Sequence, residues 1–170
     1  MDQQAQPLAR LVLLIDSDAA ARDPVRALLV PKELELIHAR GSVAGLEILQ
    51  RLPERFRLVM VNVEMPVLSG AVVILTLRLC LPDLPVLCMR PQRLAAASVG
   101  GDCLPSPFEL PELRAHLDEA LAGIHDVPGI DTVSPKTLAR AKAVFNATGN
   151  LLDAARELER DTPGEAASGW

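Results

Sequence analysis

Histidine and cysteine supply most metal ligands and reactive groups at neutral pH, and the chain contains three of each. His38, His116 and His125 are widely separated, and none has a second metal ligand at helical spacing. We expect all three to be solvated or hydrogen-bonded structural side chains. The sequence also contains no glycine-rich phosphate loop, no nucleophile elbow and no Ser/His/Asp arrangement. It therefore predicts that the protein is not an enzyme.

The three cysteines are Cys80, Cys88 and Cys103, and each lies in an apolar run. Their number is odd and their spacing matches no zinc-binding pattern. A free cysteine behaves as a small buried hydrophobic residue, and reducing compartments keep thiols from pairing. We expect three buried free thiols in a reducing cytoplasm.

Short apolar runs typical of strands alternate along the chain with helical patterns, and these elements must position the histidines and cysteines. Strands are predicted over residues 11–15, 34–39, 57–61, 85–89 and 102–104, and helices over 23–30, 42–51, 71–81, 94–99 and 110–122. This alternation is typical of an α/β domain with a five-stranded parallel sheet. Glu33 and Glu35 indicate that the second strand lies near the sheet edge, and Ser42 is expected to cap the second helix.

Beyond this domain, residues 125–133 contain proline and glycine and are predicted to form a linker. Residues 134–160 are predicted to form a helical hairpin. Ser134 would cap its first helix, and Asn150 its second. The segments 1–8 and 161–170 are expected to be an N-terminal and a flexible C-terminal tail.

Four short motifs stand at the strand ends of the α/β domain, in the segments LLIDSD, LVMVNVEMPVLSG, PVLCMRP and GGDCLPSPFEL. In their order and spacing they resemble the motifs of bacterial response-regulator receiver domains. The resemblance implies a CheY-like, flavodoxin-like doubly wound sheet over residues 9–124. It also implies a pocket at the strand ends where that family is phosphorylated.

The departures from the family pattern fall on that pocket. Asn62 stands at the position of the phosphorylated Asp, and Ser17 at that of the second metal-binding acid, which leaves Asp16 alone. The position of the conserved hydroxyl is Arg90 and that of the lysine is Ser106, while Cys103 stands where the family often has a switch aromatic residue. The resemblance therefore implies a degenerate receiver, or pseudo-receiver.

These substitutions change the expected chemistry. A neutral amide is a poor nucleophile, so we expect no phosphoryl transfer to Asn62. With one certain inward carboxylate, we expect Mg²⁺ binding to be lost or weak, and we expect no other cofactor. Three arrangements of Arg90 remain open: an ion pair with Asp16, a side chain in solvent beside a vacant pocket, or an anionic small ligand held with Ser17, Ser106 and Asn62. Glu64, the nearest alternative phosphate acceptor, is expected to face outward.

The hairpin segment ATGNLLDAARELE resembles the start of a Fis-class helix-turn-helix. A basic recognition helix should follow, but the chain has no Lys or Arg after Arg160. A plain helical hairpin that packs on the receiver or on a second copy is the stronger expectation. Phe145, Leu151 and Leu158 are the predicted interface residues.

Composition restricts the partners further. Lys and Arg total 17 against 22 Asp and Glu, giving a net charge of −5, which disfavours a broad phosphate-binding surface. No apolar run approaches the roughly 20 residues of a membrane span, and the first residues do not resemble a secretory signal. We expect a cytoplasmic, phosphorylation-independent regulatory protein whose partner is another protein or a second copy of the chain, as in a homodimer. The alternative is a DNA-binding transcriptional regulator that uses the hairpin.

Overall fold

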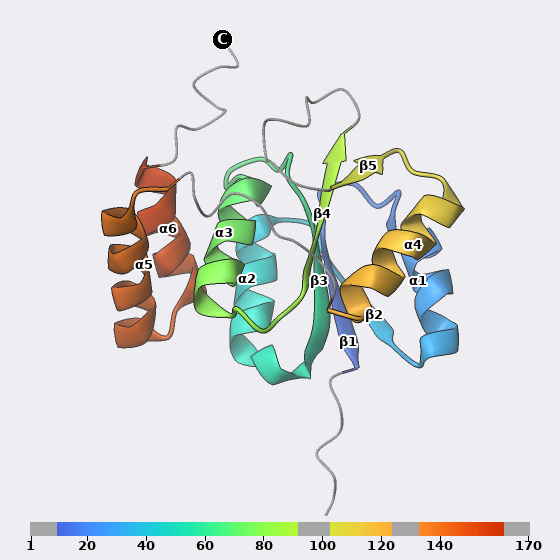
Figure 1. Ribbon diagram of the computed structural model, residues 1–170, viewed down its shortest axis with the longest axis horizontal. Helices are drawn as coiled ribbons and strands as arrows, with labels where there is room; N and C mark the ends of the chain where they lie inside the picture. Colours follow the sequence, from blue (N-terminus) through green and yellow to red (C-terminus); the bar gives the residue numbers. More distant parts are fainter. Residues whose placement is uncertain (1–9, 92–102, 124–132, 162–170) are drawn as a thin grey trace, which may run out of the picture.

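The computed structural model describes residues 10–91, 103–123 and 133–161 (Figure 1). In these ranges five parallel strands form one sheet in the order β2-β1-β3-β4-β5. The strands are β1 Leu11–Ile15, β2 Glu35–Ala39, β3 Phe56–Asn62, β4 Val86–Pro91 and β5 Leu104–Ser106. The predicted doubly wound sheet is confirmed, and β2 lies at its edge as its glutamates indicated.

Helices cover both faces of the sheet. The helices are α1 Arg22–Leu29, α2 Ser42–Arg51, α3 Gly70–Cys80, α4 Leu110–Leu121, α5 Pro135–Thr148 and α6 Leu151–Asp161, with short 3-10 turns η1 Val30–Lys32 and η2 Pro53–Arg55. In Figure 1, α1 and α4 lie on one side of the sheet, and α2 and α3 lie on the other, with α5 and α6 outside them.

The core divides into two clusters because successive strand residues point to opposite faces. In β3, Leu58 and Met60 face the cluster beneath α1 and α4, whereas Val59 and Val61 face the cluster beneath α2 and α3. All four side chains are fully buried. Such continuous burial is what a parallel strand covered on both faces requires.

The C-terminal hairpin shares a core with the α/β domain. Helix α6 packs against α3 and α2, and α5 packs on α6. The backbone N–H of Leu151 donates to Gln50 Oε1 in α2 at 2.7 Å. Helix α3 is therefore covered by the sheet on one side and by the hairpin on the other, which explains why seven of its residues are buried.

Most of the predicted capping is confirmed, with one correction. Ser134 Oγ accepts from the N–H of Thr137, and Asn150 Oδ1 accepts from the N–H groups of Leu152 and Asp153. Ser42 does not cap α2: Gly41 is the N-cap, and Ser42 Oγ instead donates to the carbonyl oxygen of Leu68 at 2.8 Å. A buried hydroxyl needs a partner, and the loop before α3 provides it.

Some predicted boundaries shift, and some lie outside the described residues. The fifth strand begins at Leu104 rather than at residue 102, and its Ser106–Pro107 peptide bond is cis. The predicted helix over 94–99, nearly all of the predicted linker, the N-terminal tail and His125 fall outside the described ranges. Within those ranges, no helix combines the length and the apolar character that a membrane crossing requires.

Candidate functional site

The carboxyl ends of β1 and β3 bring together Asp16 and Asn62, two of the predicted site residues. Adjacent parallel strands end at the same edge of the sheet, and β1 pairs with β3 in register. Asn62 Nδ2 donates to Asp16 Oδ1 at 3.1 Å, and the backbone N–H of Asp18 donates to the same oxygen at 3.0 Å. Asn62 Oδ1 accepts from the N–H of Glu64 at 2.9 Å. Both polar ends of the Asn62 amide are thereby occupied.

Asp16 is the buried acid of this site, with 3% of its surface exposed. Burial raises the pKa of Asp16, and the negative charge of Asp18 raises it further. Hydrogen bonds from the Asp18 N–H and from Asn62 lower this pKa, and so does the charge of the nearby His38. His38 Nε2 donates to the backbone oxygen of Asp16 at 2.9 Å, as expected for a hydrogen-bonded structural histidine. The site thus holds one buried carboxyl, whose Oδ1 accepts two N–H groups.

The loop between β3 and α3 fixes the position of Asn62. The N–H of Val63 donates to the Met89 oxygen in β4 at 2.9 Å, and the N–H of Gly70 donates to the Val63 oxygen at 3.1 Å. A Cβ at Gly70 would overlap the carbonyl oxygen of Asn62 and lie 2.6 Å from Val63 Cα. Only glycine permits this approach. Val67, at the tip of the loop, has φ 70° and is 92% exposed.

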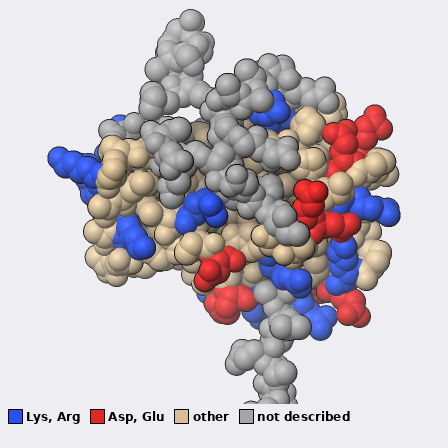
Figure 2. Space-filling model, viewed as in Figure 1, with Lys and Arg blue, Asp and Glu red and all other residues tan. Residues whose placement is uncertain are grey.

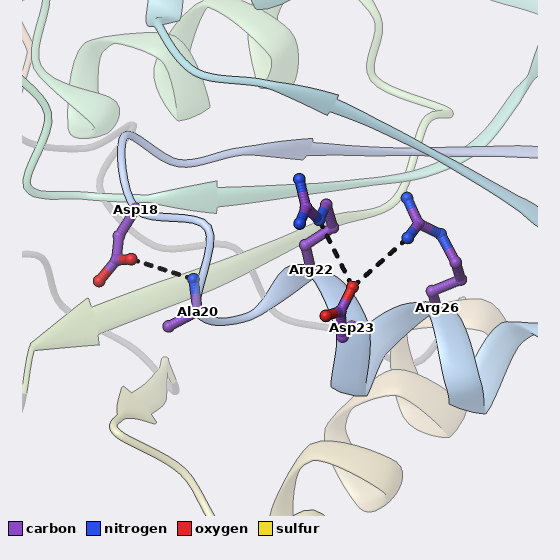
Figure 3. A network of polar contacts seen from close by, with 5 residues as sticks. All are labelled: Asp18, Ala20, Arg22, Asp23 and Arg26. Carbon is purple, nitrogen blue, oxygen red and sulfur yellow. Dashed lines mark hydrogen bonds and ion pairs between the residues drawn. The ribbon is translucent and has the colours of Figure 1, made fainter.

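Asp18 and Ser17 lie outside the pocket. Both are exposed, and Figure 3 shows the Asp18 carboxylate turned to the N–H of Ala20, which donates to it at 3.0 Å. Asp18 therefore orders the turn before α1 and does not complete an acidic pair with Asp16. The same view shows Asp23 accepting from Arg22 and Arg26 on the exposed surface of α1, at 3.5 and 3.4 Å.

Arg90 and Ser106 lie on the next two strands of the same edge. Arg90 is opposite Pro105, and Ser106 is opposite Pro91; both side chains are half-buried. Among the described residues there is no ion pair between Arg90 and Asp16, so the structure does not contain the first of the three arrangements left open by the sequence. The side chain that hydrogen-bonds to the Asp16 carboxylate is instead the Asn62 amide.

This donor set does not suit Mg²⁺, the ion that the resembled family uses. Magnesium requires oxygen ligands in octahedral geometry. Asp16 Oδ1 already accepts two N–H groups, and one of them belongs to the side chain that would have to be a second carboxylate. In the described part of the chain, no three His, Cys, Asp or Glu side chains are grouped to hold a metal ion.

The cysteine prediction is wrong for two of the three residues. Cys88 in β4 and Cys103, immediately before β5, form a disulfide with a Cα–Cα distance of 4.7 Å. Cys80 is free and half-buried at the end of α3, where burial raises the pKa of its thiol to about 11. The pairing depends on β4 and β5 being neighbours, and the order of the strands in the sheet was the signal available to find it.

The predicted interface residues also need correction. Leu151 is 1% exposed and Leu158 is fully buried, both in the core shared with α3. Their apolar stripe faces the α/β domain of the same chain, so these two side chains are closed to a partner. Phe145, on α5, is half-buried and packs at the margin of that core.

Comparison with known proteins finds a regulatory protein of similar sequence. The transcriptional regulatory protein CpxR homolog of Haemophilus influenzae is 33% identical over 116 residues, covering 65% of this chain and 49% of that protein. The chain thus spans about half the length of the curated relative that it matches. No protein-family model matches the sequence.

Solved structures extend the comparison to the fold. A response-regulator receiver domain from Clostridium thermocellum superposes with a TM-score of 0.56 at 21% identity, over 66% of this chain and 94% of that one. The receiver domain of AraT from Geobacillus stearothermophilus gives 0.58 at 20% identity, over 68% and 95%. The chain has the receiver fold. Asp16 and Asn62 therefore lie at the strand edge where this fold usually carries its ligand site.

Proposed function

We propose that this protein is a receiver-like regulatory module whose state does not depend on phosphorylation and which acts through protein contacts. The observation that carries the proposal is the Asn62 amide. It stands at the end of β3, donates to Asp16 and accepts from the Glu64 N–H. A side chain with no negative charge and with both polar ends engaged is a poor acceptor for a phosphoryl group.

Asp16, Ser106 and Glu64 support the same proposal. Phosphoryl transfer needs cations that neutralise the oxygens of the transferred group. Asp16 is a single buried carboxyl with two donors on one oxygen, and Ser106 has no charge to offer. Glu64 is exposed on the loop and lies outside the pocket. The similarity to a transcriptional regulatory protein supports a regulatory role for the chain.

The test is incubation of the full chain with acetyl phosphate and Mg²⁺, followed by intact-mass measurement. We expect no species heavier by the roughly 80 Da of a phosphoryl group. A receiver protein that can be phosphorylated, incubated under the same conditions, is the positive control and shows that the donor is active. The Asn62→Asp variant restores a carboxylate and shows whether the amide alone blocks transfer. A phosphorylated parent chain would contradict the proposal, and the Glu64→Gln variant would show whether Glu64 had accepted the group.

Self-association is the contact that can be measured without knowing a partner. Phe145 is the predicted interface residue that keeps a partly exposed side chain. Sedimentation velocity over a range of concentrations should show a dimer for the parent and a weaker one for Phe145→Ala. Leu110→Ala, which changes an exposed side chain of α4, is the control and should behave like the parent. A single monomeric species at every concentration would contradict the homodimer.

DNA binding through the hairpin is the second candidate, and the charge of α5 favours it. Helix α5 contains Lys136, Arg140 and Lys142 and no acidic residue, and the α5 end of the face in Figure 2 shows Lys and Arg without Asp or Glu. Against it, Arg140 pairs with Glu157 at 3.8 Å, and α6 is packed on the α/β domain. Titration of labelled duplex DNA at increasing salt decides: binding that weakens steeply with salt supports this candidate, and no binding at low salt excludes it.

A further inference from the structure

The Cys88–Cys103 disulfide joins two neighbouring strands, one of which is the short edge strand β5. Met89 is opposite Leu104 in the parallel pairing of β4 with β5, so Cys88 and Cys103 stand one step earlier in the same register. The bond therefore acts as an extra rung of the ladder, at a Cα separation that disulfides commonly adopt.

Strand β5 is the weakest strand of the sheet by its own hydrogen-bonding capacity. It has three residues, lies at the sheet edge and has β4 as its one neighbour. Its central residue is Pro105, whose nitrogen carries no hydrogen, so β5 can donate from two backbone N–H groups at most. Short edge segments with few hydrogen bonds open at lower free energy than the core. The covalent link thus adds to the few backbone hydrogen bonds of β5 and to the packing of its fully buried Leu104.

The link also lies close to the candidate site. Cys88 is opposite Val61 in β3, and the next pair in the register is Asn62 with Met89. Beyond the disulfide, β4 carries Arg90 and β5 carries Ser106 to the same edge of the sheet. Any movement of β5 away from β4 would displace Ser106 relative to Arg90 and Asn62.

The third thiol is not placed to interfere. Cys80 ends α3, while Cys88 lies in the middle of β4, and both members of the disulfide are at least 96% buried. With its pKa raised by burial, the Cys80 thiol stays protonated at neutral pH and is a weak attacking group. An external thiol must therefore reach the disulfide through local opening of the β5 edge.

We propose that Cys88 and Cys103 form a reversible redox clasp that sets whether β5 is fastened to β4. An external dithiol attacks one sulfur, and its second thiol resolves the mixed disulfide. Two electrons and two protons pass from the dithiol to the Cys88–Cys103 disulfide. The protein disulfide becomes two thiols, and the reagent becomes a disulfide. A small-molecule or protein disulfide reverses the step. The inference adds an input to the proposed function and does not rest on it.

The test compares the full chain in its oxidised form and after reduction by dithiothreitol without denaturant. Alkylation and intact mass count the thiols, and hydrogen exchange is followed in peptides covering 86–91 and 103–110. We expect exchange in these peptides to rise about tenfold or more on reduction, and to return on reoxidation with oxidised glutathione. Strand β2, the other sheet edge, is the internal control and should change by less than about twofold.

Two variants keep the result interpretable. Cys80→Ser retains the pair and should respond as the parent does. The double variant C88A/C103A should match the reduced parent in either buffer; if it does not fold, the parent measurement alone still decides. Unchanged exchange at β4 and β5 after reduction would overturn the clasp. Reduction of the disulfide only when all five strands lose protection together would also overturn the clasp, because the bond would then be reduced only on global unfolding.

Discussion

Asn62 Nδ2 lies 3.1 Å from Asp16 Oδ1, and this contact joins the carboxyl ends of the neighbouring strands β1 and β3. It places a neutral donor against a buried acid at the edge where receiver domains gather their functional groups. The contact defines what the pocket can hold, and several consequences can be measured.

Replacing Asn62 by Asp should destabilise the fold. The variant loses a donor to Asp16 Oδ1 and sets two carboxylates side by side in a half-buried pocket. We expect the free energy of unfolding to fall by about 1–3 kcal/mol at neutral pH. The loss should shrink in acid as the carboxylates become protonated. Urea unfolding of the parent and variant measures it, with exposed Glu64→Gln as the control; an equally stable variant would refute the assignment.

Asp16 should make stability depend on pH in a defined direction. Its pKa is raised mainly by burial, so the native state holds more protons than the unfolded state just above the ordinary carboxyl range. The free energy of unfolding therefore falls as the pH rises through the raised pKa and stays lower above it. We expect Asp16→Asn, whose Oδ1 can keep both hydrogen bonds, to be more stable than the parent at neutral pH and no more stable in acid below both pKa values.

Urea titrations from acidic to neutral pH test this expectation. Asp23→Asn, on the exposed surface of α1, is the control and should change stability by less than about 0.5 kcal/mol throughout. If Asp16→Asn were less stable than the parent at neutral pH, the carboxylate would be making a favourable interaction that outweighs its burial.

Gly70 should tolerate no side chain. A methyl group there would collide with the backbone at Asn62 and Val63, which cannot move without disturbing the β3–β4 pairing. We expect Gly70→Ala to lower the free energy of unfolding by about 3 kcal/mol. Gly41→Ala, where a Cβ meets nothing within 4 Å, is the matched control and should change it far less. Similar losses in the two variants would show that the loop adapts.

Val67 should be a site where stability can be gained. A β-branched residue at φ 70° occupies a region that costs L-residues roughly 1–2 kcal/mol, and its exposed side chain packs against little. We expect Val67→Asn to raise the free energy of unfolding by about 1 kcal/mol, because Asn adopts this conformation readily. Val30→Asn, at an exposed valine with φ −55°, is the control and should bring no gain.

Leu158 should report on the docking of the hairpin. Its side chain is fully buried in the core shared by α6 and α3. We expect Leu158→Ala to cost about 2–5 kcal/mol, and the hairpin to unfold in one transition with the α/β domain. Leu110→Ala, on the exposed side of α4, should cost less than about 0.5 kcal/mol. Two separate transitions in the parent would mean that the hairpin is only loosely attached.

Local patterns were sufficient to predict the individual strands and helix caps. The run LVLLI marks β1 by its continuous apolar residues, and the capping of α5 and α6 depends on Ser134 and Asn150 themselves. Each of these features is determined within a few residues of chain. The strand-end location of Asp16 and Asn62 follows from strand order, which the family resemblance supplied.

The errors concern contacts between distant segments. Serine is a residue type that commonly caps helices, but the Ser42 hydroxyl donates to the carbonyl oxygen of Leu68, in a loop 26 residues away. The cysteines pair because β4 and β5 are neighbours in a definite register. The stripe with Leu151 and Leu158 was correctly assigned to one helix face, yet the sequence does not say which surface that face covers. Periodicity predicts that a face is buried, and only the assembled fold supplies the partner.

The hydrogen bond between Gln50 and the N–H of Leu151 links residues 101 positions apart. During synthesis, α2 leaves the ribosome long before α6 does, so the acceptor on Gln50 is made well before its donor on Leu151. When α6 forms, Gln50 on α2 supplies an acceptor for one of its unpaired first-turn N–H groups. A nascent chain stalled before Leu151 would therefore lack the helix that covers α3 and would leave this apolar surface open to chaperones.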